Sequence, residues 1–502
     1  MPTRQRPLPT PLLLGGLLAL AVACGAPAPA PGGPAAPAPH ATGPAEVETA
    51  LAALIPQLLE AGEVPGLAIA LIRDDQVWLR GFGVADTATH RPVTRDTVFQ
   101  AASLSKPVFA YAVMKLVDAG ALDLDRPLID YLPGSYDVGP DPRLGQITAR
   151  HALSHTTGFP NWRTGALAIQ LPPGTQFSYS GEGIVYLAKV VEHITGEPFE
   201  AFMKRTVLDP LAMTSSGYTA PADPARSASP HDIAGAPIAT PQPAGRTRNP
   251  AAGLYTTAAD YARFVIAVQR GTGLSPAAHA RMLTAQIQVT DAGPESIGRR
   301  DPELRRDLAW GLGWGLATTT AGAAFWHWGD NGGTKALIVA LEQPRLAVIV
   351  FANSVNGLSI TRDIVATALG IAQPGLDWLG YEAYDAPVRV LARAIRAHGA
   401  APALADYRSG RSARIPEPDL NRLGYQLAGI RRMSDAIAVL AQNVADHPAS
   451  ANTYDSLAEV YDQAGERDKA IANYRRSVAL DPSNTHGVTE LARLTGSAAP
   501  TP

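Results

Sequence analysis

Cysteine is almost absent from this chain, because its 502 residues include a single one, Cys24. One cysteine excludes a disulfide framework and a zinc cluster built from cysteines. An excess of charge of one sign is also lacking, since 42 basic residues stand against 45 acidic ones. The chain has no basic stripe, which argues against a nucleic-acid partner. Charged residues make up only 17% and hydrophobic ones 46%, so the chain can bury a substantial core.

The first 24 residues have the pattern of an export signal. A short basic start precedes an apolar run over 12–23, which is too short to span a bilayer comfortably and ends in small residues. The sequence Ala-Val-Ala-Cys-Gly at 21–25 resembles a bacterial lipobox, in which the cysteine becomes the lipidated first residue. We therefore predict a signal peptide over 1–24 and a lipid anchor on Cys24, with the protein facing the periplasm or the cell exterior. Ordinary signal-peptidase cleavage and an uncleaved anchor are the alternatives.

The segments that follow differ in composition. Residues 25–45 are nearly all Ala, Pro and Gly and are expected to form a semi-rigid tether. Residues 46–375 contain no second linker of this kind, and strand patterns at both ends enclose mostly helical ones. This order predicts an α/β (α+β) body with one antiparallel sheet built from both ends and a helical lobe beside it. We expect strands at 66–72, 76–84, 309–318, 322–328, 335–341 and 346–352, and helices at 46–61, 103–119, 148–155, 181–194, 199–207, 258–269 and 358–369.

The first sign of chemistry is the sequence Ser-Leu-Ser-Lys at 103–106. At the start of a helix, Ser-x-x-Lys places the hydroxyl and the ammonium one turn apart on the same face. A serine hydroxyl needs a base or a nearby cation to become a nucleophile, and a helix N-terminus favours a developing oxyanion. Taken alone, the motif is equally compatible with an N-capping serine and a surface lysine.

Several further segments follow this motif in a characteristic order. In that order and spacing, they resemble the class C β-lactamase-related serine hydrolases over residues 46–372, and the resemblance implies a β-lactamase/transpeptidase-like two-lobed fold. The segments are Thr-Val-Phe-Gln-Ala-Ala-Ser-Leu-Ser-Lys at 97–106, Ala-Leu-Ser-His-Thr-Thr-Gly-Phe at 152–159, Phe-Ser-Tyr-Ser-Gly at 177–181, Ala-Gly-Leu-Tyr-Thr-Thr at 252–257, Trp-Gly-Leu-Gly-Trp at 310–314 and His-Trp-Gly at 327–329.

The resemblance also implies roles for individual residues. Ser103 would be the acylated nucleophile, and the charge of Lys106 would lower the pKa of both Ser103 and Tyr179. Tyr179 would act as the base, which requires its pKa to fall from about 10 towards neutrality. The backbone N–H groups of Ser103 and Asp330 would form the oxyanion hole. No metal and no organic cofactor is implied. The ordinary alternative for Tyr179 is a half-buried aromatic whose hydroxyl is satisfied.

Three positions bear on the substrate, namely Gly181, His327 and Gly329, and two of them depart from the family pattern. Gly181 stands where asparagine is usual, so a side-chain amide is missing. His327 replaces a permanently charged lysine and is mostly neutral near pH 7, although it could also be a residue at the edge of the core. We therefore expect esters or amides containing D-amino acids to be better substrates than β-lactams. A D,D-peptidase or a true β-lactamase is the alternative within this class.

A metal site is not expected. His151 and His155 have the spacing of zinc ligands on one helix face, but no third ligand is suggested and the Ser-His-Thr-Thr-Gly context explains His155 as a turn residue. The sequence Asp-Asn-Gly-Gly at 330–333 is more typical of a turn beside the site than of a calcium loop.

The C-terminal part repeats itself with a period of 34 residues. Residues 451–484 align with 417–450 and place alanine and proline at the same phases, which resembles tetratricopeptide repeats. We predict a helical connector over 376–416 and an all-α repeat domain over 417–498. Such repeats form a groove for a peptide or protein, or serve as a packing appendage. A protein whose repeats bind a partner while its catalysis is weak is the alternative from another functional class.

Overall fold

The computed structural model describes most of the chain. The predicted signal peptide, with its Cys24, and nearly all of the tether lie outside the described residues. No helix within the described ranges is long and apolar enough to cross a membrane. The described residues all belong to one compact unit. The described ranges are 43–134, 136–239, 249–299, 302–411 and 413–496.

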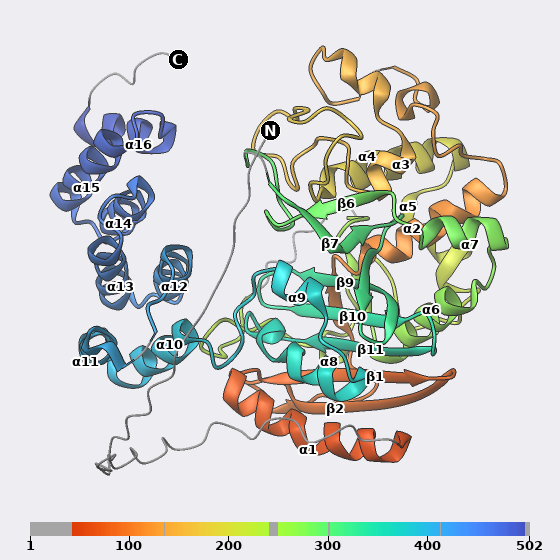
Figure 1. The fold of residues 1–502 in the computed structure, drawn as a ribbon, viewed down its shortest axis with the longest axis horizontal. Coiled ribbons are helices and arrows are strands. Elements are labelled where there is room, and N and C mark those ends of the chain that lie inside the picture. Colours follow the sequence, from red (N-terminus) through yellow and green to blue (C-terminus); the bar gives the residue numbers. More distant parts are fainter. Residues whose placement is uncertain (1–42, 135, 240–248, 300–301, 412, 497–502) are drawn as a thin grey trace, which may run out of the picture. The chain divides into compact units, whose positions relative to one another are not determined.

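An antiparallel nine-stranded sheet lies at the centre of the body, in the order β3-β2-β1-β11-β10-β9-β8-β7-β6. Strands from the two ends of the body meet in it, because β1 pairs with β11 in register from Leu67↔Ala352 to Arg73↔Leu346 (Figure 1). The expected sheet built from both ends is therefore confirmed. Its strands are β1 (Gly66–Arg73), β2 (Gln76–Asp86), β3 (Arg91–Pro92), β6 (Ile287–Thr290), β7 (Leu304–Trp310), β8 (Gly315–Thr319), β9 (Gly322–Asp330), β10 (Lys335–Leu341) and β11 (Leu346–Ala352).

Both faces of the sheet are covered, because alternate residues of a strand point to opposite faces. In β1, Leu67 and Ile69 belong to one apolar cluster, together with residues of helices α1 (Pro44–Gly62), α8 (Thr361–Leu369) and α9 (Pro374–Trp378). Ala68 and Ala70 belong to the other cluster, with residues of α2 (Ser105–Asp118) and α6 (Ala258–Arg270). A strand buried on both sides explains why β1 is a continuous apolar run rather than an alternating one.

The helical lobe contains most of the helices expected between the two groups of strands. It also contains two short paired strands, β4 and β5, which hold the segment before α2. The elements are β4 (Phe99–Ala102), α3 (Ala149–Leu153), α4 (Gly181–Thr195), α5 (Phe199–Met203), β5 (Leu254–Thr256) and α7 (Pro276–Met282).

Two of the expected elements are built differently in the structure. The predicted strand over 309–318 is two strands, β7 and β8, joined by a tight turn at Gly313. Gly313 has φ +85°, and a Cβ atom there would lie 2.2 Å from the Cβ of Ala110 in helix α2, so the turn requires glycine. The predicted helix over 199–207 ends as an α-helix at Met203 and continues as a π-helical turn, Lys204–Leu208.

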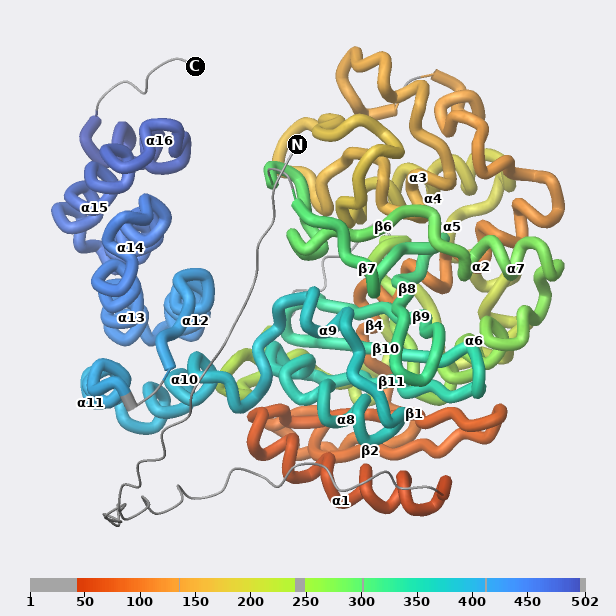
Figure 2. The backbone as a smooth tube through the Cα atoms, viewed as in Figure 1, coloured from red at the N-terminus to blue at the C-terminus, as the bar shows by residue number. Residues whose placement is uncertain are grey.

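The C-terminal part is all helical and contains two successive helix pairs, α12/α13 and α14/α15 (Figure 2). The 34-residue period places a small residue of the first helix near a large one of the second. A Cβ on Gly424 would lie 2.5 Å from Leu440, and Ala458 and Tyr474 share one buried cluster. The helices are α10 (Pro387–His398), α11 (Ala400–Asp406), α12 (Glu417–Gly429), α13 (Met433–Asp446), α14 (Ala451–Gln463), α15 (Arg467–Leu480) and α16 (Thr485–Thr495).

Candidate active site

Ser103 lies in a strained turn between β4 and α2. The residue before it, Ala102, has φ +48°, a left-handed conformation that is uncommon for a residue with a Cβ atom. Ser105 holds this turn, because its hydroxyl donates to the carbonyl of Ala102 at 2.6 Å and accepts from the N–H of Leu254 in β5 at 2.9 Å. A backbone strained at one residue and fixed by its neighbours is typical of a functional position. Helix α2 begins at Ser105, two residues later than the motif suggested.

Lys106 is fully buried behind Ser103. Its Nζ lies 2.9 Å from Ser103 Oγ, 3.0 Å from the carbonyl oxygen of Ala251 and 4.5 Å from the ring centroid of Tyr179. All three neighbours are neutral groups. Burial holds the pKa of Lys106 well below its ordinary value, because the ammonium would lose its hydration without gaining a counter-charge. Burial therefore favours the uncharged amine of Lys106 beside the serine hydroxyl.

Tyr179 is also buried, on the segment that leads into α4. Burial raises the pKa of its phenol above the ordinary value, and the contact with Ser103 offsets only part of this effect. The direction is opposite to the one required of a base at neutral pH. Lowering the pKa of Tyr179 would need a charged Lys106, and the same burial disfavours that charge. Burial therefore favours the uncharged form of both groups, the amine of Lys106 and the phenol of Tyr179.

His155 positions Tyr179. Its ring centroid lies 4.3 Å from that of Tyr179, and its Nδ1 accepts a hydrogen bond from the N–H of Ser180 at 3.0 Å. Its carbonyl oxygen accepts from the N–H of Ser178 at 2.8 Å. Burial also holds the pKa of His155 well below its ordinary value, so the ring is a neutral spacer. His155, which was expected to be a turn residue, therefore also holds residues 178–180 in place through these hydrogen bonds.

The end of β9 forms the opposite wall. The pairing of β8 with β9 ends at Trp326, and the rest of β9 contacts β4. A Cβ atom on Gly329 would lie 2.5 Å from the carbonyl oxygen of Ala101, so only glycine allows β9 to come so close to the turn that holds Ser103. This close approach places Asp330, the last residue of β9, on the pocket beside Ser103.

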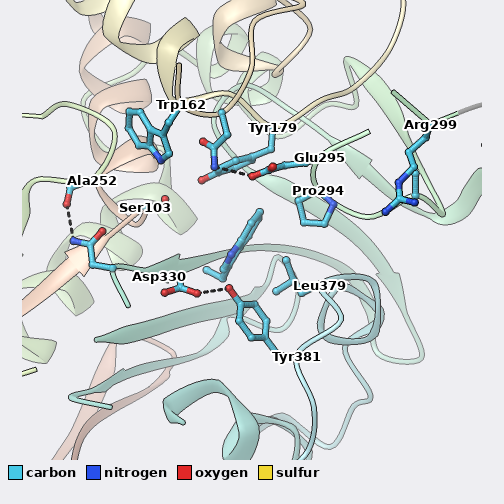
Figure 3. A pocket seen from close by; sticks show the side chains of 14 residues that line it. Ser103, Trp162, Tyr179, Ala252, Pro294, Glu295, Arg299, Asp330, Leu379 and Tyr381 are labelled. Atoms are coloured by element: carbon cyan, nitrogen blue, oxygen red, sulfur yellow. Dashed lines mark hydrogen bonds between the residues drawn. The ribbon is translucent and has the colours of Figure 1, made fainter. Parts of the chain in front are cut away.

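These residues surround a pocket of about 440 Å³. Trp162 and Tyr179 lie on one side of Ser103, and Asp330 and Tyr381 lie on the other (Figure 3). Of the predicted site residues, Ser103, Tyr179 and Asp330 line the pocket and Lys106 lies directly behind it, whereas Gly181, His327 and Gly329 are not part of the lining. The lining residues are Ser103, Asn161, Trp162, Tyr179, Ala252, Ala292, Pro294, Glu295, Arg299, Trp328, Asp330, Asn331, Leu379 and Tyr381.

Gly181 is separated from the pocket by an aromatic ring. A Cβ atom on Gly181 would lie 2.5 Å from the ring of Trp162, which therefore occupies the space that a longer side chain would need. Trp162 itself is 43% exposed, which is unusual for so large an apolar side chain. The absence of a side chain at Gly181 therefore leaves room for the ring of Trp162.

His327 is fully buried beside Lys106. Its Nδ1 lies 2.7 Å from the carbonyl oxygen of Trp328, and its ring centroid lies 6.0 Å from that of Tyr179. Burial is the main cause that lowers the pKa of His327 to about 3. It therefore supplies no cation to the pocket, and the neighbouring Trp328 lines the wall in its place.

Sequence reasoning missed Trp162, Leu379 and Tyr381 as pocket residues. Trp162 follows the motif at 152–159 by three positions, which is the only local clue. Leu379 and Tyr381 belong to the segment interpreted as a connector, and no pattern there indicated a role in the site. Their places depend on how the chain after α9 passes the end of β9, where Tyr381 contacts Asp330.

The two histidines with zinc-like spacing have separate surroundings. His151 bonds to Thr148 at the start of α3, whereas His155 bonds to Ser180. Within the described ranges, no group of three or more His, Cys, Asp or Glu side chains is arranged to hold a metal ion.

Comparisons with known proteins give a consistent result. A family model described as Beta-lactamase matches residues 51–369. The chain is 27% identical over 336 residues to penicillin-binding protein 4 of Amycolatopsis lactamdurans, covering 61% of this chain and 85% of that one. It is 28% identical over 307 residues to the esterase EstB of Burkholderia gladioli, covering 50% and 78%. A solved structure, the octameric penicillin-binding protein homologue from Pyrococcus abyssi, has 22% identity and a TM-score of 0.55, with 70% of this chain and 81% of that chain covered.

Proposed function

The chain belongs to the beta-lactamase family of serine hydrolases, and on this premise we propose that it cleaves an ester or amide through an acyl-enzyme on Ser103. The observation that carries the proposal is the 2.9 Å contact between Ser103 Oγ and the buried Lys106 amine, whose pKa burial holds well below its ordinary value. A nucleophile and a proton acceptor within hydrogen-bond reach are what acyl transfer to serine requires.

The geometry supports a sequence of proton transfers. The Ser103 hydroxyl gives its proton to the Lys106 amine while its oxygen bonds to the substrate carbonyl carbon. The resulting oxyanion would accept hydrogen bonds from the N–H groups of Ser103 and Asp330. The Tyr179 phenol then protonates the leaving group and recovers a proton from the Lys106 ammonium. Water attacks the acyl-enzyme with the same groups in reverse, so the role of base is shared by Lys106 and Tyr179.

The favoured substrates are esters, or amides containing D-amino acids, rather than β-lactams. The pocket lacks the side-chain amide that asparagine would supply at 181, and His327 is neutral and buried. A substrate carboxylate would therefore meet no permanent cation at that position. The alternative is a D,D-peptidase or β-lactamase, and benzylpenicillin labelling of Ser103 without turnover would favour the peptidase.

The test is hydrolysis of p-nitrophenyl butyrate by residues 25–502 beside a Ser103→Ala variant. We expect activity in the first protein and none in the second. Equal activity in both would refute Ser103 as the nucleophile. Penicillin turnover approaching that of a dedicated β-lactamase would refute the substrate preference.

Export is a further part of the proposal. We propose that residues 1–24 direct the chain out of the cytoplasm and that a lipidated Cys24 anchors it, supported by the lipobox-like sequence at 21–25. The test is incorporation of radiolabelled palmitate by the wild type and by Cys24→Ala. Equal labelling of the two proteins would refute the anchor.

The C-terminal helices are proposed to be tetratricopeptide repeats that bind a peptide or protein. Support comes from the 34-residue period and from the two helix pairs it predicts at 417–446 and 451–480. If binding rather than catalysis is the main function, deletion of 417–498 abolishes the cellular phenotype while Ser103→Ala leaves it intact. The reverse result would assign the phenotype to catalysis.

A further inference from the structure

We propose that Tyr381 is a positioning residue for the oxyanion site, so that the segment joining the body to the C-terminal helices completes the catalytic pocket. Tyr381 lies beyond residues 51–369, the part of the chain that the family model matches. It nevertheless lines the pocket together with Leu379, on the side that faces Asp330 (Figure 3). The inference rests on the proposed acyl-enzyme function, because it assigns a role to the oxyanion donor.

The contact that carries the inference is a hydrogen bond. The Tyr381 hydroxyl donates to Asp330 Oδ2 at 2.6 Å. The other oxygen, Oδ1, accepts from the N–H of Gly332 at 2.8 Å and forms an ion pair with Lys335. Donors on both oxygens leave the carboxylate of Asp330 with one orientation.

This arrangement matters because the backbone N–H of Asp330 is the proposed oxyanion donor. An oxyanion hole stabilises charge only when its donors are already in place, since any reorganisation during the reaction weakens the effect. A free carboxylate on the same residue would also repel the negative charge that develops on the substrate. Tyr381 and Lys335 fix Asp330 and occupy both its oxygens, which reduces this repulsion.

Tyr381 is in turn held by the helical C-terminal part. The next residue, Glu382, is only 11% exposed and forms ion pairs with Arg389 of α10 at 3.5 Å and with Arg422 of α12 at 2.5 Å. Partly desolvated ion pairs hold their partners more firmly than exposed ones do. Helix α12, the first helix of the repeated part, is therefore connected to the pocket through two adjacent residues, Tyr381 and Glu382.

The test compares Tyr381→Phe with Tyr384→Phe in the full chain without its signal peptide. Both changes remove one hydroxyl, but Tyr384 is not part of the pocket lining. Removing an oxyanion donor outright costs about 100- to 1000-fold in kcat, so loss of a group that positions one should lower kcat about tenfold. We expect this loss for Tyr381→Phe, with KM and the melting temperature close to the wild type, and no loss for Tyr384→Phe.

A double-mutant comparison shows whether Tyr381 acts through Asp330. In an Asp330→Ala background the carboxylate is gone but the backbone N–H remains, so Tyr381→Phe should have no further effect on kcat. An unchanged kcat in Tyr381→Phe, or additive losses in the double variant, would overturn this role while the wild type still hydrolyses the ester. A wild type without Ser103-dependent turnover would overturn the proposed function, and the role of Tyr381 with it.

The link to α12 is tested separately. Arg422→Gln should lower kcat about two- to threefold, because Glu382 keeps its second partner, Arg389. The matched control is Arg475→Gln on the exposed face of α15, which should leave kcat unchanged. Equal kcat in the Arg422 and Arg475 variants would limit the inference to Tyr381 itself and refute the connection to α12.

Discussion

Two buried lysines flank the proposed catalytic pocket, and their surroundings differ. Lys106 lies behind Ser103 among a hydroxyl, a carbonyl and an aromatic ring, whereas Lys335 lies behind Asp330 and forms an ion pair with its carboxylate. Burial lowers the pKa of both, and the Asp330 carboxylate works against that effect for Lys335 alone. Because an unpaired buried amine is costly, it is expected where chemistry needs a free base. The paired lysine is a structural support.

The largest expected effect comes from removing the unpaired lysine. Lys106→Met keeps the length of the side chain and should lower kcat/KM for p-nitrophenyl butyrate at least about a thousandfold. The free energy of unfolding should be unchanged or rise by about 1 kcal/mol, since an uncompensated buried amine is lost. Activity assays and urea unfolding check both parts. A variant that is inactive and also much less stable would contradict the distinction between the two lysines.

For Lys335, which forms an ion pair with Asp330, we expect the loss of stability to be the main effect. Lys335→Met leaves the carboxylate of Asp330 without its cation and should lower the free energy of unfolding by about 2 kcal/mol. Activity per folded molecule should fall far less than in Lys106→Met. Urea unfolding together with active-site titration measures the two quantities. Equal loss of activity in Lys106→Met and Lys335→Met would contradict the proposed difference between the two lysines.

The pH dependence of stability sharpens the comparison further. Burial lowers the pKa of Lys106 below its ordinary 10.5. At a pH between these two values, the side chain is protonated in the unfolded chain but not in the native protein. Between the lowered pKa and 10.5, the free energy of unfolding therefore rises with pH, by at most about 1.4 kcal/mol per unit. Below the lowered pKa this dependence disappears. The free energy of unfolding of the wild type minus that of Lys106→Met, measured by urea unfolding, should increase from pH 8 to pH 9. A difference that is flat or falls would argue that Lys106 is charged.

The smallest expected effect concerns the aromatic wall above Ser103. Trp162→Ala should lower kcat/KM for esters of aromatic acids about fivefold relative to acetate esters, because ring contacts contribute about 1 kcal/mol. Trp162→Phe is the control that keeps a ring. Gly181→Asn should be tolerated in the Trp162→Ala background and not in the wild type, since the tryptophan occupies that space. If Gly181→Asn is tolerated equally well in both backgrounds, Trp162 does not limit the side chain at position 181.

The sequence predicted the parts of the site that depend on short spacing. Ser103 and Lys106 are only three positions apart, so the turn that leads into α2 brings them together, although the α-helix itself begins at Ser105. The antiparallel sheet was also predictable, because apolar runs such as 66–72 and 346–352 must be buried on both faces. The exact strand boundaries were not, since the turn at Gly313 depends on contact with Ala110.

The sequence indicated which residues form the candidate site, but not how their surroundings shift their pKa values. Tyr179 lies where the resemblance placed it, but burial raises its pKa instead of lowering it. His327 was expected to be mostly neutral near pH 7, and its burial lowers its pKa further, to about 3. Charge depends on the neighbours on every side, which local spacing does not reveal.

The sequence by itself therefore indicated Ser103 as the candidate nucleophile, Lys106 three positions away, a sheet built from both ends of the body, and the repeat period at the C-terminus. Only the tertiary structure decided which groups surround them. Trp162 fills the space over Gly181, and Tyr381 reaches Asp330 across 51 positions of the chain. The physical reason is that local geometry fixes residues a few positions apart, whereas contacts between distant residues depend on how the whole core packs.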